Sequence, residues 1–564
     1  MSYQSKPHRF IISIMLISLI LGFLFIKIFF GLDFTDELQY YGEMYGLLKT
    51  GHLFSNDLFI QQTGYLLIYP LLSLLPVGTD LDFFVVLTRS IHALLILVTL
   101  GMVYLVYMRQ AKDLIGALLA LWLVSLSFVN FDIYSPSYNS LSYMLVALIL
   151  AIWLNSNLKG QAVLLAVLIV SLGWVYPTLG ILLAGVIILD LIFTKGLRHA
   201  SFFVLLLGVS SVLLVTVLLF SGAVEIEKFT NSIAFSKGFH VGGLGNKFHI
   251  VLSFYFSMAL LAVLLIYVIY HAPHFNLIHR YPSAIFVLGG VFFLIGAVLV
   301  TTSWWRFSVI FWFACLFLLF FVIGIEEQRR STITRILIMA VSVSLVSALT
   351  SGNGFTVLFR GFFLALGFIY FEIVCSSIVS KNPSISLKNV YQVGATLSTM
   401  IILVMLTHPY RDLPIWNLSA GSGSAPAFKG ISISPEKKAA IDWARSELKE
   451  IPKDGHLLIV GAQPWIYFVT EANMDTDMVF MHFRGSDVAF AELAENLVKR
   501  QPEYILITVD EMPDSIRNAL DLIMSRKVYK CHSKNFDSML NEHLFQQTSY
   551  EIPERVSLCK IINT

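Results

Sequence analysis

A short acidic stretch directly after the first apolar segment is the part of the chain best equipped for chemistry. Residues 31–48 read GLDFTDELQYYGEMYGLL and carry the carboxylates of Asp33, Asp36, Glu37 and Glu43. The adjacent pair Asp36–Glu37 could accept a proton from an attacking hydroxyl group, or hold a divalent metal ion that neutralises a leaving phosphate. The competing interpretation is that both acids only stabilise the N-terminus of a helix.

Helical spacing indicates which side chains share this chemistry. Thr35 is placed to cap a helix that begins with Asp36 and Glu37. The helical repeat then puts Asp36, Tyr40 and Glu43 on one face, so Tyr40 and Glu43 are candidates for contact with a substrate. A second face is apolar and aromatic and suits the membrane surface; it holds Leu38, Tyr41 and Tyr45.

A further carboxylate lies in the loop at residues 130–139. Asp132 is the only acid between Asp113 and Asp190, and its loop also contains several Tyr and Ser residues. We expect Asp132 to be a catalytic carboxylate that faces the first acidic pair across the site, with Tyr138 as another substrate contact. The alternative is that Asp132 is an ordinary solvated acid of a loop.

Five basic side chains are candidates for binding a phosphate group. Arg89 lies inside the second apolar span, where a charge at mid-membrane costs roughly 2.5–3.5 kcal/mol, so such a residue usually faces protein or a cavity. Its expected partner is an outer-loop carboxylate or a phosphate, and snorkelling to the interface is the plain alternative. The others lie in outer loops, where interfacial anchoring competes with phosphate binding; they are Lys237, His240, Arg306 and Arg360.

The elements that must position these residues are membrane spans. The chain of 564 residues is 57% hydrophobic and only 13% charged, whereas soluble proteins are about 25% charged. Apolar runs of roughly 18 residues are candidates for spanning helices. They predict a polytopic α-helical membrane protein with about thirteen spans, at 10–31, 83–108, 113–131, 140–157, 161–176, 178–194, 201–222, 248–270, 284–303, 305–325, 334–350, 357–379 and 390–408.

The distribution of Lys and Arg sets the expected orientation, because cytoplasmic loops are enriched in these residues. One set of loops holds thirteen of them and the opposite set holds six. We therefore expect a cytoplasmic N-terminus and, with an odd number of spans, an extracytoplasmic C-terminal region on the same side as the acidic stretch. The first span is expected to be retained, since no A-x-A-like cleavage site follows it. No Lys- or Arg-rich block indicates nucleic-acid binding.

The composition changes after the last span of the expected membrane module, residues 1–408. Residues 409–430 are rich in Ser, Gly, Ala and Pro and predict a linker, while residues 431–564 predict a small extracytoplasmic α/β domain. Alternating elements favour a Rossmann-like sandwich, with helices at 435–449, 463–472, 487–500 and 513–526 and strands at 456–461, 477–482, 503–509, 527–531 and 556–562.

Two features of this domain bear on its chemistry. No G-x-G-x-x-G fingerprint follows its first strand, so we expect no nucleotide site there. Cys531 and Cys559 could form a disulfide if the domain is extracytoplasmic, or could be free thiols.

The order of these motifs resembles the GT-C superfamily of integral-membrane glycosyltransferases, most closely the protein O-mannosyltransferase and lipid A aminoarabinose transferase group. One span is followed by DELQY at 36–40 and then by YLLIYP at 65–70. Arg89 opens a span that ends in YMR at 107–109, and Asp132 matches the second outer-loop acid. The resemblance covers about the first two hundred residues by motif, and the rest by span count alone.

The resemblance implies an inverting transfer of a sugar from a polyprenyl-phosphate donor to an acceptor at the outer membrane face. Asp36 would be the candidate base, and Glu37 would orient it or help to bind a cation. Some members use a divalent metal ion, for which Asp36 and Glu37 would be the ligands, and others do not. The implied partners are a lipid-linked donor, the bilayer of a bacterial inner membrane, and a glycan, lipid or protein acceptor.

The chain departs from the family pattern in the first outer loop, residues 32–82. The family's common Lys-Pro-Pro stretch is replaced here by QQTGY at 61–65. The family's lysine would contact the donor phosphate, so one of the basic side chains named above must take that role.

Two other functions stay open. A polysaccharide polymerase or ligase shares the topology and the lipid-linked donor, but such enzymes rely on outer-loop Arg and His residues. A lipid or sugar transporter or flippase keeps ionisable residues near the membrane midplane. Here we expect only Arg89 and His92 to enter the spans, which argues against transport.

Overall fold

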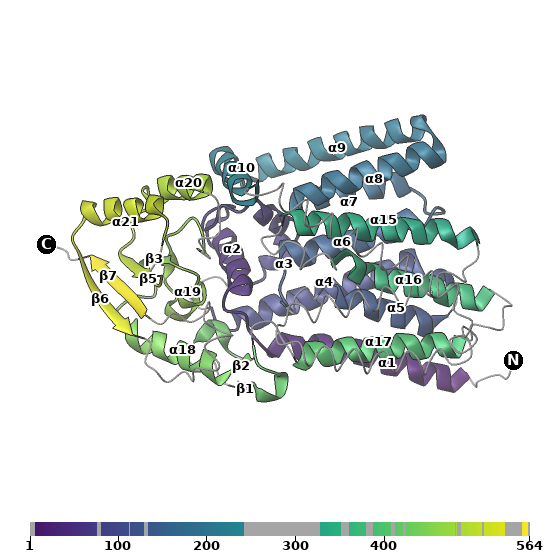
Figure 1. Ribbon diagram of the computed structural model, residues 1–564, viewed down its shortest axis with the longest axis horizontal. Helices are drawn as coiled ribbons and strands as arrows, with labels where there is room; N and C mark the ends of the chain where they lie inside the picture. The colour runs from purple at the N-terminus through teal and green to yellow at the C-terminus, as the bar shows by residue number, and fades with distance from the viewer. Residues whose placement is uncertain are drawn as a thin grey trace, which may run out of the picture.

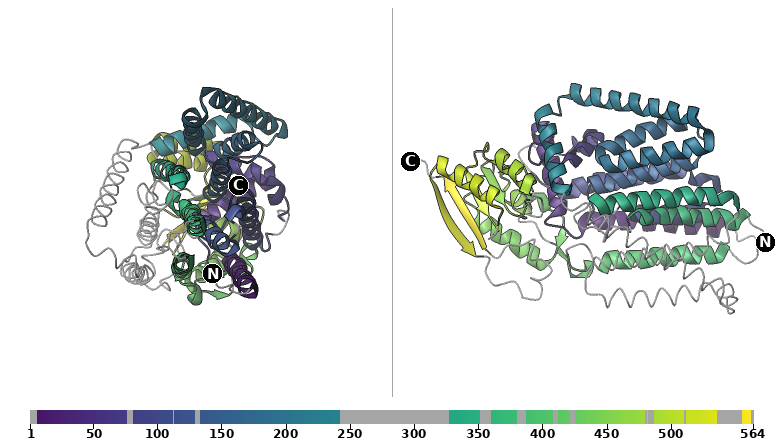
Figure 2. Two further views of the ribbon diagram at one scale, coloured as in Figure 1. Left: turned by 90° about the vertical axis from the view of Figure 1, so that its right-hand side faces the viewer. Right: turned by 45° about the horizontal axis from the view of Figure 1, so that its top comes forward.

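The computed structural model of the chain shows a bundle of long helices with an α/β region at one end (Figure 1). The right-hand view of Figure 2 also shows the strands beyond the end of the bundle opposite to the start of its first helix. The structure describes residues 6–75, 81–111, 113–128, 133–241, 327–350, 360–379, 387–407, 412–420, 425–479, 481, 487–509, 512–535 and 555–561.

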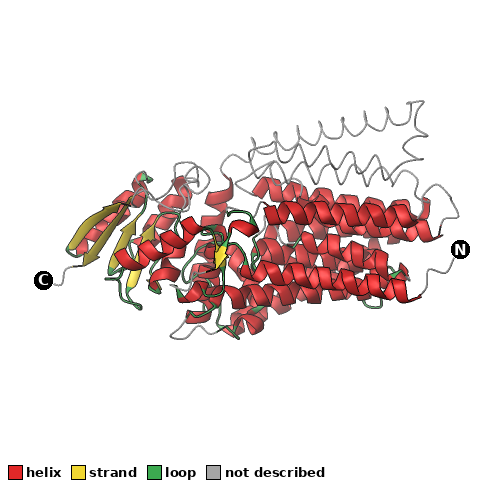
Figure 3. Ribbon diagram, turned by 90° about the horizontal axis from the view of Figure 1, so that it is seen from below, coloured by secondary structure: helices red, strands yellow, loops and turns green. Residues whose placement is uncertain are grey.

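The helices of the bundle run side by side along its long axis (Figure 3). Local sequence sets several of their boundaries: the Asp113 carboxylate accepts the Gly116 N–H, Ser137 and Ser140 cap each other's backbone, and Pro177 occupies a first-turn position. The helices are α1 (Lys6–Phe29), α4 (Phe84–Val106), α5 (Leu114–Leu126), α6 (Tyr138–Leu154), α7 (Gln161–Val175), α8 (Pro177–Lys195), α9 (Leu197–Ser221), α15 (Glu327–Thr350), α16 (Arg360–Val379) and α17 (Leu387–Thr407).

The bundle has the length and hydropathy of a membrane domain. Five of its helices are long and apolar enough to cross a bilayer, namely those at Phe10–Phe29, Phe84–Val106, Pro177–Lys195, Leu197–Ser221 and Ser331–Thr350. Ten of the thirteen expected spans coincide with described helices. The other three, 248–270, 284–303 and 305–325, lie outside the described residues, so the count of thirteen stays a prediction.

The described part of residues 32–82, the segment expected as the first outer loop, folds into short helices at the end of the bundle. They are α2 (Asp36–Thr50), the 3₁₀ helix η1 (Ile60–Leu67) and α3 (Tyr69–Leu72). Helix α2 ends because Gly51 adopts a φ of 74°, which lets its N–H donate to the Leu47 carbonyl. Another short helix, α10 (Ile226–Val241), follows α9 at the same end of the bundle (Figure 1).

The expectation that Leu38, Tyr41 and Tyr45 face the membrane surface is wrong, because protein covers all three. Leu38 and Tyr41 are fully buried, because α2 is covered on one side by the bundle and on the other by the α/β region. The Tyr41 ring packs edge-on against Phe84 of α4 at 5.9 Å, and the Tyr45 ring contacts Phe468 of the α/β region at 6.5 Å. An aromatic stripe that suits lipid equally suits a protein interface.

The α/β region contains a five-stranded mixed sheet in the order β4-β3-β5-β7-β6. Strands β4, β3 and β5 are parallel, while β7 runs antiparallel to β5 and β6. The sandwich is therefore Rossmann-like in only part of its sheet. Its elements are α18 (Pro435–Glu447), β3 (His456–Val460), α19 (Trp465–Thr470), β4 (Asn473–Met474), α20 (Asp487–Leu497), β5 (Tyr504–Ile507), α21 (Asp514–Arg526), β6 (Tyr529–Asn535) and β7 (Arg555–Ile561).

The structure tests the strand expected at 477–482 and the state of the two cysteines of this region. The strand expected at 477–482 is displaced, because β4 pairs with β3 earlier in the chain, at Asn473–Met474. Cys531 and Cys559 face each other across β6 and β7 and form a disulfide. The free-thiol alternative does not apply to this structure.

Alternate residues of β3 enter two different hydrophobic cores. Leu457 and Ile459 belong to a core that continues through α18 and α19 into the helical bundle. Leu458 and Val460 belong to a second core under α20 and α21, which Phe59 and Phe235 from the bundle side also join. The two ends of the molecule thus share hydrophobic cores rather than only a surface contact.

The segment expected as a linker contacts the bundle. The Phe83 N–H donates to the Pro426 carbonyl at 3.0 Å, and Lys429 forms an ion pair with Asp82 at 2.6 Å. The Gly31 N–H donates to the Ser432 carbonyl at 2.9 Å. These contacts join residues 425–433 to the start of α4 and the end of α1.

A buried ion pair fixes the chain where α1 leads into α2. The Lys437 Nζ of α18 lies 3.7 Å from Asp412 Oδ2, with both side chains fully buried. Lys437 also donates to the Leu32 carbonyl at 2.5 Å, and Asp412 accepts the Leu32 N–H at 3.0 Å. Both backbone polar groups of Leu32 are therefore held by this pair.

We predict that Lys437→Met and Asp412→Asn each lower the free energy of unfolding by roughly 3–5 kcal/mol, because each leaves a buried charge without its partner. The measurement is thermal unfolding of the detergent-solubilised protein, followed by tryptophan fluorescence. Lys453→Met, which removes a half-exposed ion pair with Glu471, should change stability by no more than about 1 kcal/mol. Equal effects of Lys437→Met and Lys453→Met would contradict the role given to the pair.

Candidate active site

Glu37 and Arg89 form a bidentate ion pair in the interior. Arg89 Nε donates to Glu37 Oε1 and Arg89 Nη2 donates to Glu37 Oε2, both at 2.8 Å. Each side chain is only 2% exposed. Of the two partners expected for Arg89, the structure places the outer-loop carboxylate against it.

The remaining donors of Arg89 cap the C-terminal end of α1. Its Nη1 lies 3.4 Å from the Lys27 carbonyl and 3.2 Å from the Ile28 carbonyl, and its Nη2 donates to the Gly31 carbonyl at 2.7 Å. Helix C-termini leave such carbonyls unpaired within the helix. All five N–H groups of the guanidinium are thereby used, which explains a cation at this depth and leaves none for a phosphate.

Glu37 is saturated in the same way. Its Oε1 also accepts the Tyr41 hydroxyl at 2.6 Å, and its Oε2 also accepts the Asp33 N–H at 3.2 Å. A carboxylate offers about four lone-pair sites, and the two bonds from Arg89 fill the others. In this arrangement Glu37 ties α1, α2 and α4 together and has no free acceptor for a metal ion or a proton.

Asp33, rather than Thr35, supplies the cap of α2. The Thr35 side chain makes no capping bond, although Thr35 occupies the cap position as expected. Instead Asp33 Oδ2 accepts the Glu37 N–H at 3.0 Å, and Asp33 Oδ1 accepts the Thr35 hydroxyl at 2.8 Å. Asp33 thus has a structural role at the start of the helix.

Asp36 differs from the other three acids of the stretch. Asp33, Glu37 and Glu43 are 3%, 1% and 4% exposed, whereas Asp36 is partly exposed. It stands in the first turn of α2, directly after α1, where the helix N-terminus favours an ionised carboxylate. Asp36 is close enough to Tyr40 to contribute, after burial and Tyr138, to raising the pKa of the Tyr40 phenol.

The expected face of α2 continues inward through Tyr40 to Glu43. Glu43 Oε2 accepts the Tyr65 hydroxyl of η1 at 2.9 Å and Glu43 Oε1 accepts Gln39 Nε2 at 3.1 Å. Burial raises the pKa of Glu43 well above its usual range, and Asp57 raises it further. Asp36, Tyr40 and Glu43 therefore form a polar row that runs from a partly exposed carboxyl group to a buried one.

Aromatic side chains from two other elements border this row. Asn139 Nδ2 donates to the Tyr40 hydroxyl at 3.2 Å, and the Tyr40 and Tyr138 rings meet edge to face at 6.0 Å. Tyr138 in turn contacts the Tyr176 ring at 5.7 Å, and the Tyr176 hydroxyl is hydrogen-bonded to Thr350. Tyr138, one of the expected substrate contacts, is thus brought together with Tyr40.

The structure does not place the other expected site residues against this row. Asp132 and Arg306 lie outside the described residues. Lys237 and His240 are in the last turns of α10 and Arg360 begins α16, but only their backbones are described. Their expected roles stay predictions.

Sequence reasoning missed several polar residues of the interior. Asp57 and Tyr65 lie in an irregular loop and a 3₁₀ helix, where no periodic pattern marks a buried face. The expectation that only Arg89 and His92 enter the spans is wrong, because Glu372 of α16 is 3% exposed and accepts the Tyr107 hydroxyl. The sequence did contain a sign of Glu372, because it is a single acidic residue within an otherwise apolar run.

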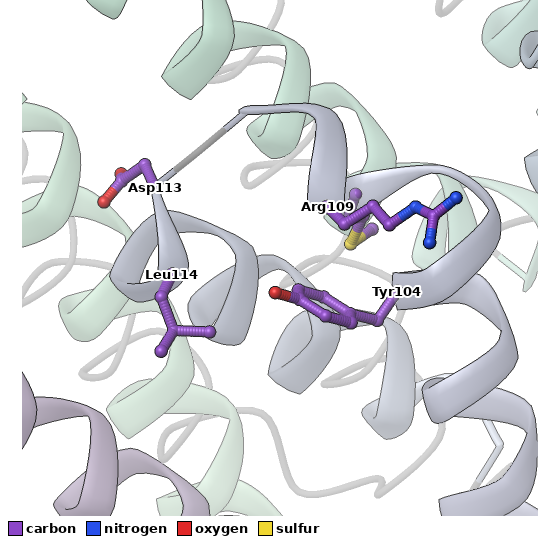
Figure 4. A pocket seen from close by; sticks show the side chains of 5 residues that line it. Tyr104, Arg109, Asp113 and Leu114 are labelled. Atoms are coloured by element: carbon purple, nitrogen blue, oxygen red, sulfur yellow. The ribbon is translucent and has the colours of Figure 1, made fainter.

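The hollow shown in Figure 4 lies at the opposite end of α4. Its volume is about 150 Å³, and Tyr104, Met108, Arg109, Asp113 and Leu114 line it. Tyr104 is fifteen residues after Arg89, or about 22 Å along the helix. Figure 4 shows the Arg109 and Asp113 side chains pointing apart, and Asp113 accepts the Tyr391 hydroxyl at 2.6 Å. The hollow is therefore separate from the acidic row.

No group of three or more His, Cys, Asp or Glu side chains in the described part of the chain is arranged to hold a metal ion. With Glu37 occupied by Arg89, the expected Asp36–Glu37 ligand pair does not fit a metal in this arrangement.

The chain matches no protein-family model and shows no significant similarity to a curated protein.

We predict that Arg89→Met and Glu37→Gln each lower the free energy of unfolding by roughly 3–5 kcal/mol, whereas the double variant loses less than the sum. Arg89→Met leaves the Glu37 carboxylate buried without its partner, and Glu37→Gln leaves the Arg89 guanidinium buried without its counter-charge. Denaturant unfolding in detergent measures the free energy of unfolding of the wild type, the two single variants and the double variant, which together form a double-mutant cycle. Lys228→Met, which removes an exposed pair with Glu225, serves as the control. Additive losses in the double variant would refute the coupling.

Proposed function

We propose that the protein is a membrane glycosyltransferase that moves a sugar from a polyprenyl-phosphate-linked donor to an acceptor, with Asp36 as the base. One observation carries the proposal: the two adjacent acids differ in exposure to solvent. Glu37 is saturated by Arg89, Tyr41 and Asp33, while Asp36 is partly exposed at the end of an apolar bundle. A lipid-borne donor would present its head group at such a boundary.

The chemistry assigned to Asp36 is proton acceptance. An acceptor hydroxyl gives its proton to the Asp36 carboxylate while its oxygen attacks the anomeric carbon, and the polyprenyl phosphate leaves from the opposite face. Tyr40 and Tyr138 would offer aromatic faces to the sugar, and Asn139 would hold the Tyr40 hydroxyl in place. Glu37 and Arg89 act only by fixing the first turn of α2.

A cation for the donor phosphate is still required. Arg89 is excluded by its saturated contacts, so the role passes to the other expected basic residues. We propose that Lys237, His240, Arg306 and Arg360 are the candidates for binding this phosphate.

The proposed setting is the inner membrane of a bacterium, with α2 and the α/β region on the outer side. The disulfide between Cys531 and Cys559 supports that orientation, because disulfides persist in oxidising compartments. Five helices of suitable length and hydropathy support the membrane setting itself.

We predict that Asp36→Asn lowers sugar transfer by about 10²–10⁴-fold, since the amide cannot accept the proton, and leaves the melting temperature unchanged. The assay follows release of polyprenyl phosphate by mass spectrometry in vesicles that contain the protein. The donors are polyprenyl phosphates that carry a hexose, a pentose or an amino sugar.

Glu227→Gln is the matched control, because Glu227 is an exposed first-turn acid of α10 at the same end of the bundle. It should transfer sugar at the wild-type rate. Full activity of Asp36→Asn with any donor that the wild type uses would defeat the assignment.

A transporter or flippase is the second candidate, and Glu372 is the observation that favours it. This carboxyl is buried within the bundle beside Tyr107, and intramembrane acids often mark transport pathways. Loss of lipid or sugar movement across vesicles in Glu372→Gln, with no wild-type transfer of sugar, would favour transport over the enzyme.

A further inference from the structure

The hollow at the end of α4 remote from Asp36 lies at the depth of a bilayer's head groups. Helix α4 has 23 residues and is therefore about 34 Å long, close to the roughly 30 Å of a hydrocarbon core. The hollow has a volume of about 150 Å³, several times the roughly 30 Å³ of a water molecule. It is thus large enough for a phosphate group but not for a whole lipid.

A positive charge without a counter-charge borders this hollow. Arg109 is exposed and forms no ion pair or hydrogen bond with any residue that the structure describes. The acids at this end have other partners: Asp113 accepts the Tyr391 hydroxyl at 2.6 Å. Glu372 accepts the Tyr107 hydroxyl. Since Figure 4 shows Arg109 directed away from Asp113, its guanidinium group is available to an external anion.

A hydroxyl group borders the hollow beside this charge. Tyr104 is partly buried, and its hydroxyl has no hydrogen-bond partner in the described part of the chain. In Figure 4 its ring lies between Arg109 and Leu114, with the hydroxyl directed towards Leu114. The hollow therefore offers a cation and a hydrogen-bond donor, which are the groups that proteins use to bind phosphate.

An exposed apolar stripe on α4 leads to the same place. Its side chains recur every three or four residues, so they share one face of the helix. Each of them is between 46% and 56% exposed, namely Leu94, Val98, Met102 and Leu105. Gly101 interrupts this face, and a Cβ added there would meet nothing within 4 Å. The face is thus apolar and notched in the direction of the hollow, as an acyl chain requires.

We propose that the hollow binds the phosphate head group of an anionic glycerophospholipid, with Arg109 as its counter-charge and Tyr104 as a hydrogen-bond donor. An acyl chain of the same lipid lies along the apolar stripe of α4. Basic side chains at the ends of membrane helices bind anionic head groups in this way, and a guanidinium matches the geometry of a phosphate. This inference rests on the proposed membrane setting, where the hollow faces the cytoplasmic leaflet, but not on the proposed transferase activity.

Native mass spectrometry of the full-length protein in detergent tests the site. The titrants are dioleoyl phosphatidylglycerol and dioleoylglycerol, which has the same chains but no phosphate. We expect the first phosphatidylglycerol to bind at least about tenfold more tightly, because only it meets the charge of Arg109. Equal affinities would overturn the proposal, since the apolar stripe alone would then account for binding. Sugar transfer is not measured, so the result is independent of Asp36.

Two variants assign the binding to the hollow. Arg109→Gln should weaken phosphatidylglycerol binding about tenfold and leave the melting temperature unchanged, because the side chain is exposed. Arg198→Gln is the matched control: Arg198 is an exposed arginine in the first turn of α9, at the same end of the bundle (Figure 1). It should bind the lipid as the wild type does. Equal affinities of Arg109→Gln and the wild type would refute the site.

Two competitors establish the kind of phosphate that the site takes. Inorganic phosphate at millimolar concentration should leave phosphatidylglycerol bound, because it has no chain to lie along α4. Displacement by inorganic phosphate would reduce the hollow to a site for free anions and overturn the proposal. A polyprenyl phosphate should bind more weakly than phosphatidylglycerol. Tighter binding of the polyprenyl phosphate that is lost in Arg109→Gln would also overturn it, since the hollow would then serve the lipid carrier of the sugar.

Discussion

The structure depends on one buried ion pair, that of Glu37 with Arg89. A guanidinium in an apolar helix is tolerated only when its charge and all its donors are satisfied. Here Glu37 and the last carbonyls of α1 satisfy them together. The same contacts stop α1, turn the chain into α2 and hold α2 against α4. Removing either partner would leave a buried group without compensation, so the start of α2 is rigidly specified.

This constraint divides the work between two adjacent acids. Glu37 faces inward, and its two oxygens are occupied by hydrogen bonds that hold the fold together. Asp36 lies about 100° further around the helix and remains partly exposed. The helix that presents Asp36 is then enclosed from above by the α/β region through Phe34, which stacks on Trp465 at 4.9 Å. A rigid first turn under a protein cover is a suitable place for a positioned base.

Local patterns predicted much of this arrangement. Apolar runs located ten described helices of the bundle, and the helical repeat placed Asp36, Tyr40 and Glu43 on one face. A proline after a serine marked the start of α18, where Ser434 accepts the Lys437 N–H. These predictions succeed because they rest on interactions between residues close in sequence.

The features that sequence patterns did not predict depend on contacts between segments far apart in the chain. The burial of Tyr45 depends on the α/β region, more than 390 residues further along the chain, because its ring contacts Phe468. The pairing of Arg89 was one of two alternatives, and only the fold selects Glu37. Asp57 gives no signal in sequence at all, because its importance comes from the Val479 N–H of the other region. Helical periodicity carries no information about such pairings.

The most direct test of the account is a structure determined with a polyprenyl-phosphate-linked sugar bound. The account predicts that the sugar lies against Tyr40 and Tyr138, with Asp36 beside the path of the acceptor hydroxyl, while Glu37 stays paired with Arg89. A donor bound at the hollow near Arg109, or a Glu37 that leaves Arg89 to contact the donor, would contradict it.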